Sequence, residues 1–142
     1  MPRSLRMFFE RSLDALAVEA PAFHESLCRT LNNRQVCIRA TGERFTLTVT
    51  GRRIDLVAPS GAEHIRLDVT AGVILALVDG ELLLEEALRT GRLSVYGGVA
   101  HVPDLFDALV IYVRGAIRCP SFPVILSDFR RSSTELLHEV QR

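Results

Sequence analysis

The strongest constraint on the fold is an alternation of apolar and polar residues that runs from Val36 to Val69. Period-two alternation places one side of a strand against a core and the other side in water. Short turns separate the first three segments, which favours an antiparallel meander whose apolar face must be covered by helices. The alternating segments are residues 36–40, 45–49, 54–58 and 65–69.

The remaining apolar residues recur at helical spacing. Leu5, Phe8, Phe9, Leu13, Leu16 and Ala17 predict an N-terminal helix capped by Ser4, and Pro21 restarts a second, shorter helix. Thr70 can cap a helix over 71–78, and another is expected over 83–90. Leu93 and Val95 predict a fifth strand. A long helix over 103–118 follows, then an apolar, proline-interrupted segment over 122–129, and a short helix opened by a capping box of Ser132 and Glu135.

The long helix has more apolar surface than a surface helix needs. Its charged residues Asp104, Asp107, Arg114 and Arg118 fall within a stripe about 80° wide at about 100° per residue. The helix over 71–78 is apolar on every side. Either these helices pack against each other and against the N-terminal helices, or part of their surface lines an apolar cavity or meets a partner.

Composition excludes several classes of protein. The chain has 142 residues, the length of one domain, and its 17 arginines balance 17 acidic residues with no lysine. A nucleic-acid-binding domain is not expected because such domains are strongly basic. No apolar run approaches the roughly 20 residues of a membrane span, and charged residues interrupt any signal sequence near the N-terminus. Three cysteines without CxxC spacing favour a reducing cytoplasm over a disulfide framework.

No pattern of catalytic residues is present. The sequence has no nucleophile elbow, zinc-protease, phosphate-loop or dinucleotide motif. His101, Asp104 and Asp107 resemble a metal cluster but fit a helix N-terminus better. Arg52-Arg53 and Arg130-Arg131 could meet an anionic headgroup or a membrane surface, or could be solvated turn residues. We therefore expect no enzyme activity, no metal and no cofactor.

A stretch between the shorter helices and the last strand resembles the sterol carrier protein 2 family. That family has the pattern G-x-L-x-x-E-x-A-x-x-x-G-x-L-x-V-x-G, and the order of predicted elements over residues 5–118 is also similar. The matching residues are Gly80, Leu82, Glu85, Ala87, Gly91, Leu93, Val95 and Gly97.

The resemblance implies an α+β fold of two layers, with a five-stranded, mostly antiparallel mixed sheet covered on one face by helices. It also implies an apolar tunnel between sheet and helices that binds fatty acyl chains, sterols or related lipids, or an accessory role in lipid or quinone metabolism. We expect a single domain over 1–142, with N-terminal helices over 1–33, the sheet and its covering helices over 34–118, and a C-terminal segment over 119–142.

Strand parity and helix facing select the candidate ligand-binding positions within this fold. The expected function is non-catalytic binding of a lipid or isoprenoid in the cytoplasm, with transient membrane contact. Two alternatives stay open: an interaction domain that uses the long helix and residues 122–129 to form a homodimer or dock onto an enzyme, and a small cyclase or isomerase with Tyr112 as its polar group. The candidate positions are Phe45, Leu47, Val73, Leu77, Leu93, Val95, Leu105, Leu109, Tyr112 and Val113.

Overall fold

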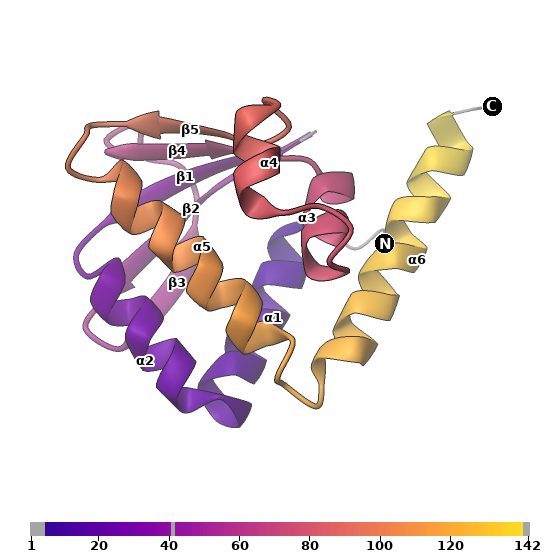
Figure 1. Cartoon of the computed structure of the whole chain (residues 1–142), viewed down its shortest axis with the longest axis horizontal. Coiled ribbons are helices and arrows are strands. Elements are labelled where there is room, and N and C mark those ends of the chain that lie inside the picture. Colours follow the sequence, from indigo (N-terminus) through magenta and orange to yellow (C-terminus); the bar gives the residue numbers. More distant parts are fainter. Residues whose placement is uncertain (1–4, 41, 141–142) are drawn as a thin grey trace.

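A five-stranded mixed sheet forms one layer of the molecule (Figure 1). The computed structural model describes residues 5–40 and 42–140, with side chains as far as residue 131. The strand order is β3-β2-β1-β4-β5, and every neighbouring pair is antiparallel except β1 with β4. The strands are β1 (Gln35–Ala40), β2 (Glu43–Thr50), β3 (Arg53–Val57), β4 (Ile65–Asp68) and β5 (Ser94–Gly97).

The predicted meander holds for three strands and is wrong for the fourth. Residues 58–64 carry the chain back across the sheet, and β4 pairs in parallel with β1 instead of with β3. This register sets Ile65 beside Val36 and Leu67 beside Ile38. All four side chains are buried, so the crossover sets strands with buried inward positions side by side and leaves β3, which has no fully buried residue, at the edge.

Six helices make up the rest of the described chain. The capping hydroxyl of Thr70 accepts a hydrogen bond of 3.2 Å from the Val73 backbone N–H, as expected. Pro21 lies in the first turn of the second helix. Backbone N–H groups there have no helical acceptor, so the N–H that proline lacks costs no hydrogen bond. The helices are α1 (Leu5–Glu19), α2 (Pro21–Thr30), α3 (Ala71–Val78), α4 (Leu84–Arg89), α5 (Val102–Ala116) and α6 (Phe122–Val140).

The start of α1 has a hydrogen-bond partner from the sheet. The predicted capping residue, Ser4, lies outside the described residues. The Glu43 carboxylate at the start of β2 accepts a hydrogen bond of 2.8 Å from the Leu5 backbone N–H. A residue distant in sequence therefore satisfies a free donor at the helix start.

The C-terminal segment forms one helix instead of an irregular stretch followed by a short helix. Helix α6 runs without a break from Phe122 to Val140. Pro123 lies in its first turn, where proline is tolerated, so it does not interrupt the helix. Phe122, Ile125 and Phe129 are buried, and the Phe129 ring stacks on Phe8 of α1 with centroids 4.5 Å apart.

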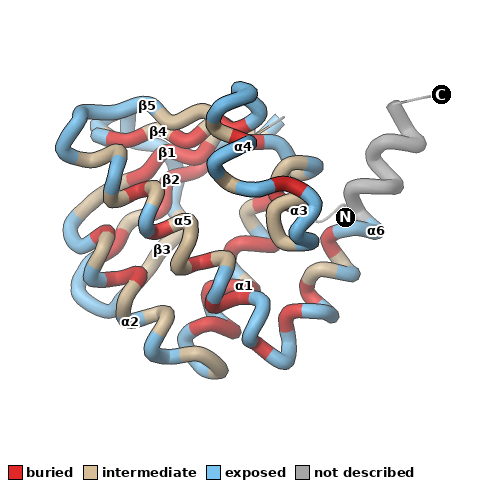
Figure 2. Tube along the Cα trace, viewed as in Figure 1, coloured by how far each residue is buried: buried red, intermediate tan, exposed pale blue. Residues whose placement is uncertain are grey.

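The core lies between the inward face of the sheet and the helices (Figure 2). The inward positions of the strands are those predicted by alternation, and they carry the buried side chains of β1, β2 and β4 apart from Cys37 and Thr46. The outward face is not wholly wet. The crossover residues 58–64 lie at one end of it, where Thr46 is only 1% exposed.

Candidate functional site

A small apolar void lies inside the core, between the sheet and helices α1, α2 and α5. Its volume is about 40 Å³. About 10–15 Å³ of such space holds one water molecule, whereas small-molecule sites occupy about 300–1,000 Å³. The void is therefore about a tenth of a ligand site in size. Its lining residues are Phe9, Leu13, Leu27, Leu31, Val36, Ile38, Leu47, Leu67, Leu105, Ala108, Leu109 and Tyr112.

Tyr112 is the only one of these lining residues whose side chain has a hydroxyl group. The Ser12 Oγ donates a hydrogen bond to the Phe9 carbonyl at 3.1 Å, so it accepts from the Tyr112 hydroxyl at 2.6 Å. Burial raises the pKa of Tyr112 well above its usual range. Because its proton is held by Ser12 and its ionisation is disfavoured, Tyr112 is suited to closing an apolar wall and not to acid–base chemistry.

The structure places the candidate positions at varying distances from this void. Leu47, Leu105, Leu109 and Tyr112 line it. Phe45 and Leu93 are buried in the same core without lining the void. Four further positions are half-buried and pack against the core from other sides, namely Val73, Leu77, Val95 and Val113.

Sequence reasoning missed the contribution of the N-terminal helices. Phe9 and Leu13 of α1, and Leu27 and Leu31 in and after α2, line the void. Helical periodicity marked most of them as apolar, but it could not show which helix lies over which strand. Val36, Ile38 and Leu67 share the inward parity of Leu47, so alternation alone could have found them.

The apolar surface of α5 is covered by the core and α2 on one side and lines a groove on the other. Its buried side faces the core, and α2 packs along it. Its outer side forms the wall of a groove of about 550 Å³ between α4 and α5, with Phe106, Val110 and Ile111 on one side and Leu83 and Leu84 on the other. Leu83 is 67% exposed there.

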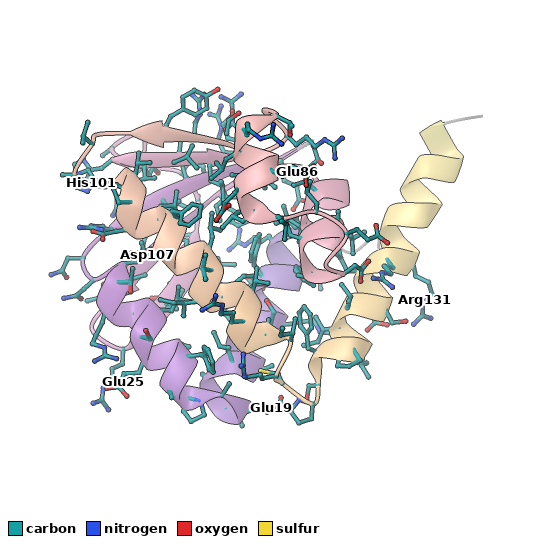
Figure 3. The ribbon with its side chains drawn as sticks, viewed as in Figure 1. Glu19, Glu25, Glu86, His101, Asp107 and Arg131 are labelled. Carbon is teal, nitrogen blue, oxygen red and sulfur yellow. The ribbon has the colours of Figure 1, made fainter. Side chains whose placement is uncertain are left out.

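The polar groups near the start of α5 do not form a metal centre. Figure 3 shows His101 at the beginning of the helix and Asp107 further along it. The His101 ring stacks on His64, with centroids 5.6 Å apart, and Asp104 pairs with Arg34. Within the described part of the chain, no three His, Cys, Asp or Glu side chains are grouped to hold a metal ion.

The cysteines are free thiols buried in the protein. Burial raises the pKa of Cys28 and Cys119, and the nearby Glu19 carboxylate raises that of Cys119 further. A raised pKa leaves little reactive thiolate at neutral pH. Among the helices described, none combines the length and hydropathy that a bilayer span requires.

The arginine pairs noted in the sequence all have acidic partners. Arg53 pairs with Asp55 on β3, and Arg52 reaches Glu25 at 3.9 Å. On α6, Arg130 pairs with Asp79, and Arg131 pairs with Asp128 at 2.8 Å. These pairs are accordingly parts of local charge networks.

Comparison with solved structures identifies the fold. It is the fold of sterol carrier protein 2 domains, so the sequence resemblance is confirmed at the level of fold. A UbiJ-SCP2 ubiquinone synthesis protein is 19% identical, with a TM-score of 0.59 over 77% of this chain and 88% of that one.

Two further structures share the fold. Sterol carrier protein 2 from Yarrowia lipolytica, in its apo form, is 16% identical with a TM-score of 0.51, covering 75% of this chain and 89% of that chain. Sterol carrier protein 2 like 2 from Aedes aegypti is 17% identical with a TM-score of 0.51, covering 73% and 98%. No protein-family model and no curated protein matches the chain.

Proposed function

We propose that this protein binds an apolar ligand, such as a fatty acyl chain or an isoprenoid, between its sheet and its helices, and acts as a non-catalytic carrier or presenter. The observation that carries the proposal is the apolar void at that place in a fold shared with sterol carrier proteins. The three buried, unpaired cysteines are compatible with a cytoplasmic location.

Binding requires the void to expand. At about 40 Å³ it holds only a few carbon atoms, so a ligand must displace a wall. Helix α5 is the wall best placed to move, because it reaches the centre of the sheet across the void and contacts mainly α2 and α1. Leu105, Ala108, Leu109 and Tyr112 would then face the ligand.

The free energies of ligand burial and of lost ligand freedom are consistent with reversible binding by a carrier. Burying a 16-carbon chain gives about 12 kcal/mol at about 0.8 kcal/mol per methylene. Lost rigid-body freedom costs between about 4 and 15 kcal/mol, and displacing α5 costs more. The remainder corresponds to weak to micromolar binding, which allows release as well as capture.

The test uses a substitution that fills the void. Ala108 is buried on α5 and lines it, so Ala108→Leu puts three more carbon atoms into the space. We expect wild-type protein to bind a fluorescent fatty acid saturably and Ala108→Leu to bind it at least tenfold more weakly. Ala17→Leu makes the same change on the exposed side of α1 and should bind normally.

Circular dichroism and thermal melts confirm that each variant is folded. Absence of saturable binding to wild-type protein would overturn the proposal, and so would undiminished binding to folded Ala108→Leu. Native mass spectrometry of the purified wild-type protein provides an independent check through co-purified lipid.

The groove between α4 and α5 favours a second candidate, an accessory domain that forms a homodimer or docks onto an enzyme of lipid or quinone metabolism. Its apolar walls and the exposed Leu83 suit a protein partner. Of residues 122–129, Phe122, Ile125 and Phe129 are buried within the chain, whereas Val124 is 62% exposed and is accessible to a partner. A stable dimer in light scattering, combined with no fatty-acid binding, would favour this candidate over the carrier.

A further inference from the structure

The outward face of the sheet holds a second concavity, on the opposite side of the sheet from the void. Its volume is about 540 Å³. Its floor is formed by outward side chains of β1 and β4, and residues 59–63 of the crossover form a wall. Arg39, Arg44 and Arg66 line it together with Glu63 and Tyr96.

Two of these arginines form an unneutralised pair. In the register of β1 with β2, Arg39 lies directly opposite Arg44, and both side chains line the pocket. Like charges directly opposite each other destabilise a sheet. Neither arginine has an ion-pair partner among the described residues.

The nearby acidic residues are engaged elsewhere. Asp68 lies opposite Arg39 in the β1–β4 register but pairs with Arg66, whose Nε is 3.1 Å from its Oδ1. The Arg66 guanidinium also lies over the Tyr96 ring, 4.1 Å from its centroid. Arg66 is thereby neutralised and held in place, whereas Arg39 and Arg44 keep their charge for another anion.

Glu63 is fixed in the wall by its own hydrogen bonds. Its Oε1 accepts from the Thr46 hydroxyl at 2.6 Å and from the Ser60 backbone N–H at 2.8 Å. These bonds satisfy the carboxylate where it stands, and it makes no ion pair with Arg44. Glu63 thus holds residues 60–63 beside the arginines, and its Oε2, which takes no part in these bonds, is the acceptor for a ligand's hydroxyl groups.

We propose that this pocket binds a small, soluble molecule that carries a phosphate monoester, with the phosphate between Arg39 and Arg44. Two adjacent guanidinium groups on rigid strands match a phosphate dianion in charge, and each can bind its oxygens through two N–H groups. A carboxylate would neutralise only one of them. The volume lies within the range of small-molecule sites, which leaves room for the rest of the ligand toward Glu63 and Tyr96.

A phosphate on a lipid bilayer is the other source of this chemistry, and the geometry disfavours it. The arginines lie on the floor and side of a concavity whose wall is residues 59–63, and that wall carries a carboxylate. Arg44 is exposed but Arg39 is half-buried, so a flat anionic surface would engage Arg44 without engaging the pair. The inference does not depend on the proposed function, since the two sites occupy opposite faces of the sheet.

The experiment is a titration of the protein with glycerol 3-phosphate and with inorganic phosphate, followed by NMR of the backbone and arginine Nε–H groups. We expect saturable shifts centred on residues 37–46 and 60–66, with glycerol alone giving none. Arg39→Gln and Arg44→Gln should each weaken glycerol 3-phosphate binding at least tenfold. Arg53→Gln is the matched control, because Arg53 is an outward arginine of the same sheet with its own partner, Asp55.

Protein stability gives a second readout. Removing either member of a like-charged pair should leave the melting temperature of the free protein unchanged or raise it, whereas a purely structural arginine would lower it. The inference would be overturned if wild-type protein did not bind phosphate saturably. It would also be overturned if Arg39→Gln and Arg44→Gln bound glycerol 3-phosphate as tightly as Arg53→Gln. Binding to phosphatidylglycerol vesicles without binding to the soluble phosphates would also overturn it and would identify a membrane contact instead.

Discussion

The ionisation of Glu63 is set by hydrogen bonds from its neighbours. The hydrogen bond from Thr46 is the largest cause, followed by that from the Ser60 backbone, and together they lower its pKa from 4.5 to about 2. Each bond stabilises the charged form of the carboxylate. Because the folded pKa lies below the unfolded one, this contribution to stability is present above about pH 4.5 and is lost as the pH falls toward 2.

We predict that Thr46→Val raises the pKa of Glu63 toward 4.5, since it removes the shortest of these bonds. An NMR titration of the Glu63 side-chain carboxyl carbon measures the change. Thr48→Val is the control, because Thr48 lies two residues along the same strand and makes no bond to Glu63. A Glu63 pKa that stays near 2 in folded Thr46→Val would contradict the assignment.

At the scale of elements, α5 is the helix that links the N-terminal helices to the void and to the outer groove. It covers the sheet across the void, contacts α1 and α2, and forms a wall of the outer groove. Gly115 near its C-terminal end permits the closest of these approaches. A Cβ built there would lie 2.5 Å from Leu16 Cδ1 and 2.8 Å from Phe23 Cβ.

We predict that Gly115→Ala destabilises the protein by about 1–2 kcal/mol, because overpacking costs about 1–3 kcal/mol and alanine returns up to about 1 kcal/mol of helix propensity. Gly72→Ala in α3 is the opposite case, since the nearest atom to its Cβ is Thr70 Oγ1 at 4.0 Å. That variant should be neutral or stabilised by up to about 1 kcal/mol. Urea unfolding measures the change in the free energy of unfolding for both variants. Equal changes would contradict the close packing of α5 against α1 and α2 at Gly115.

At the scale of the whole molecule, the sheet separates two kinds of environment. The inward face meets helices and encloses an apolar void, and the outward face carries arginines beside a wall of crossover residues. A ligand on the inward side must move a layer of the fold, whereas a ligand on the outward side meets a site already formed. The two binding events should therefore differ in how far they displace the helical layer.

We predict that palmitic acid, below its micelle concentration and at about 100 times its dissociation constant, stabilises the protein by about 2.7 kcal/mol. For a domain of this size the melting temperature should rise by about 5–11 °C, as measured by calorimetry. Ala108→Leu, which should bind at least tenfold more weakly, should be stabilised by about 1.4 kcal/mol or less at the same concentration. An unchanged wild-type melting temperature under these conditions would contradict saturable binding to the folded state, and an equal rise in folded Ala108→Leu would mean that palmitic acid binds outside the void.

Local sequence determined most of the elements. Alternation determined which side of each strand faces the core, and the bounds of the first five helices lie close to those expected because caps and apolar spacing act over a few residues, whereas α6 begins ten residues before the expected capping box. Thr70 and Pro21 are such cases. The sequence also showed that α5 has surplus apolar surface, although it could not show how that surface divides between α2, the void and the outer groove.

The tertiary structure decided what depends on contacts between distant residues. In the tertiary structure β4 lies beside β1, and Phe9 and Leu27 line the void. Phe129 of α6 stacks on α1. Arg39 and Arg44 flank one turn, so hairpin pairing could have placed them opposite each other. Only the tertiary structure shows that Asp68 pairs with Arg66 and that Glu63 bonds to Thr46. The charges of Arg39 and Arg44 therefore stay unneutralised. Periodicity reports which face of an element is apolar, but it carries no information on which element covers that face or how much space is left between them.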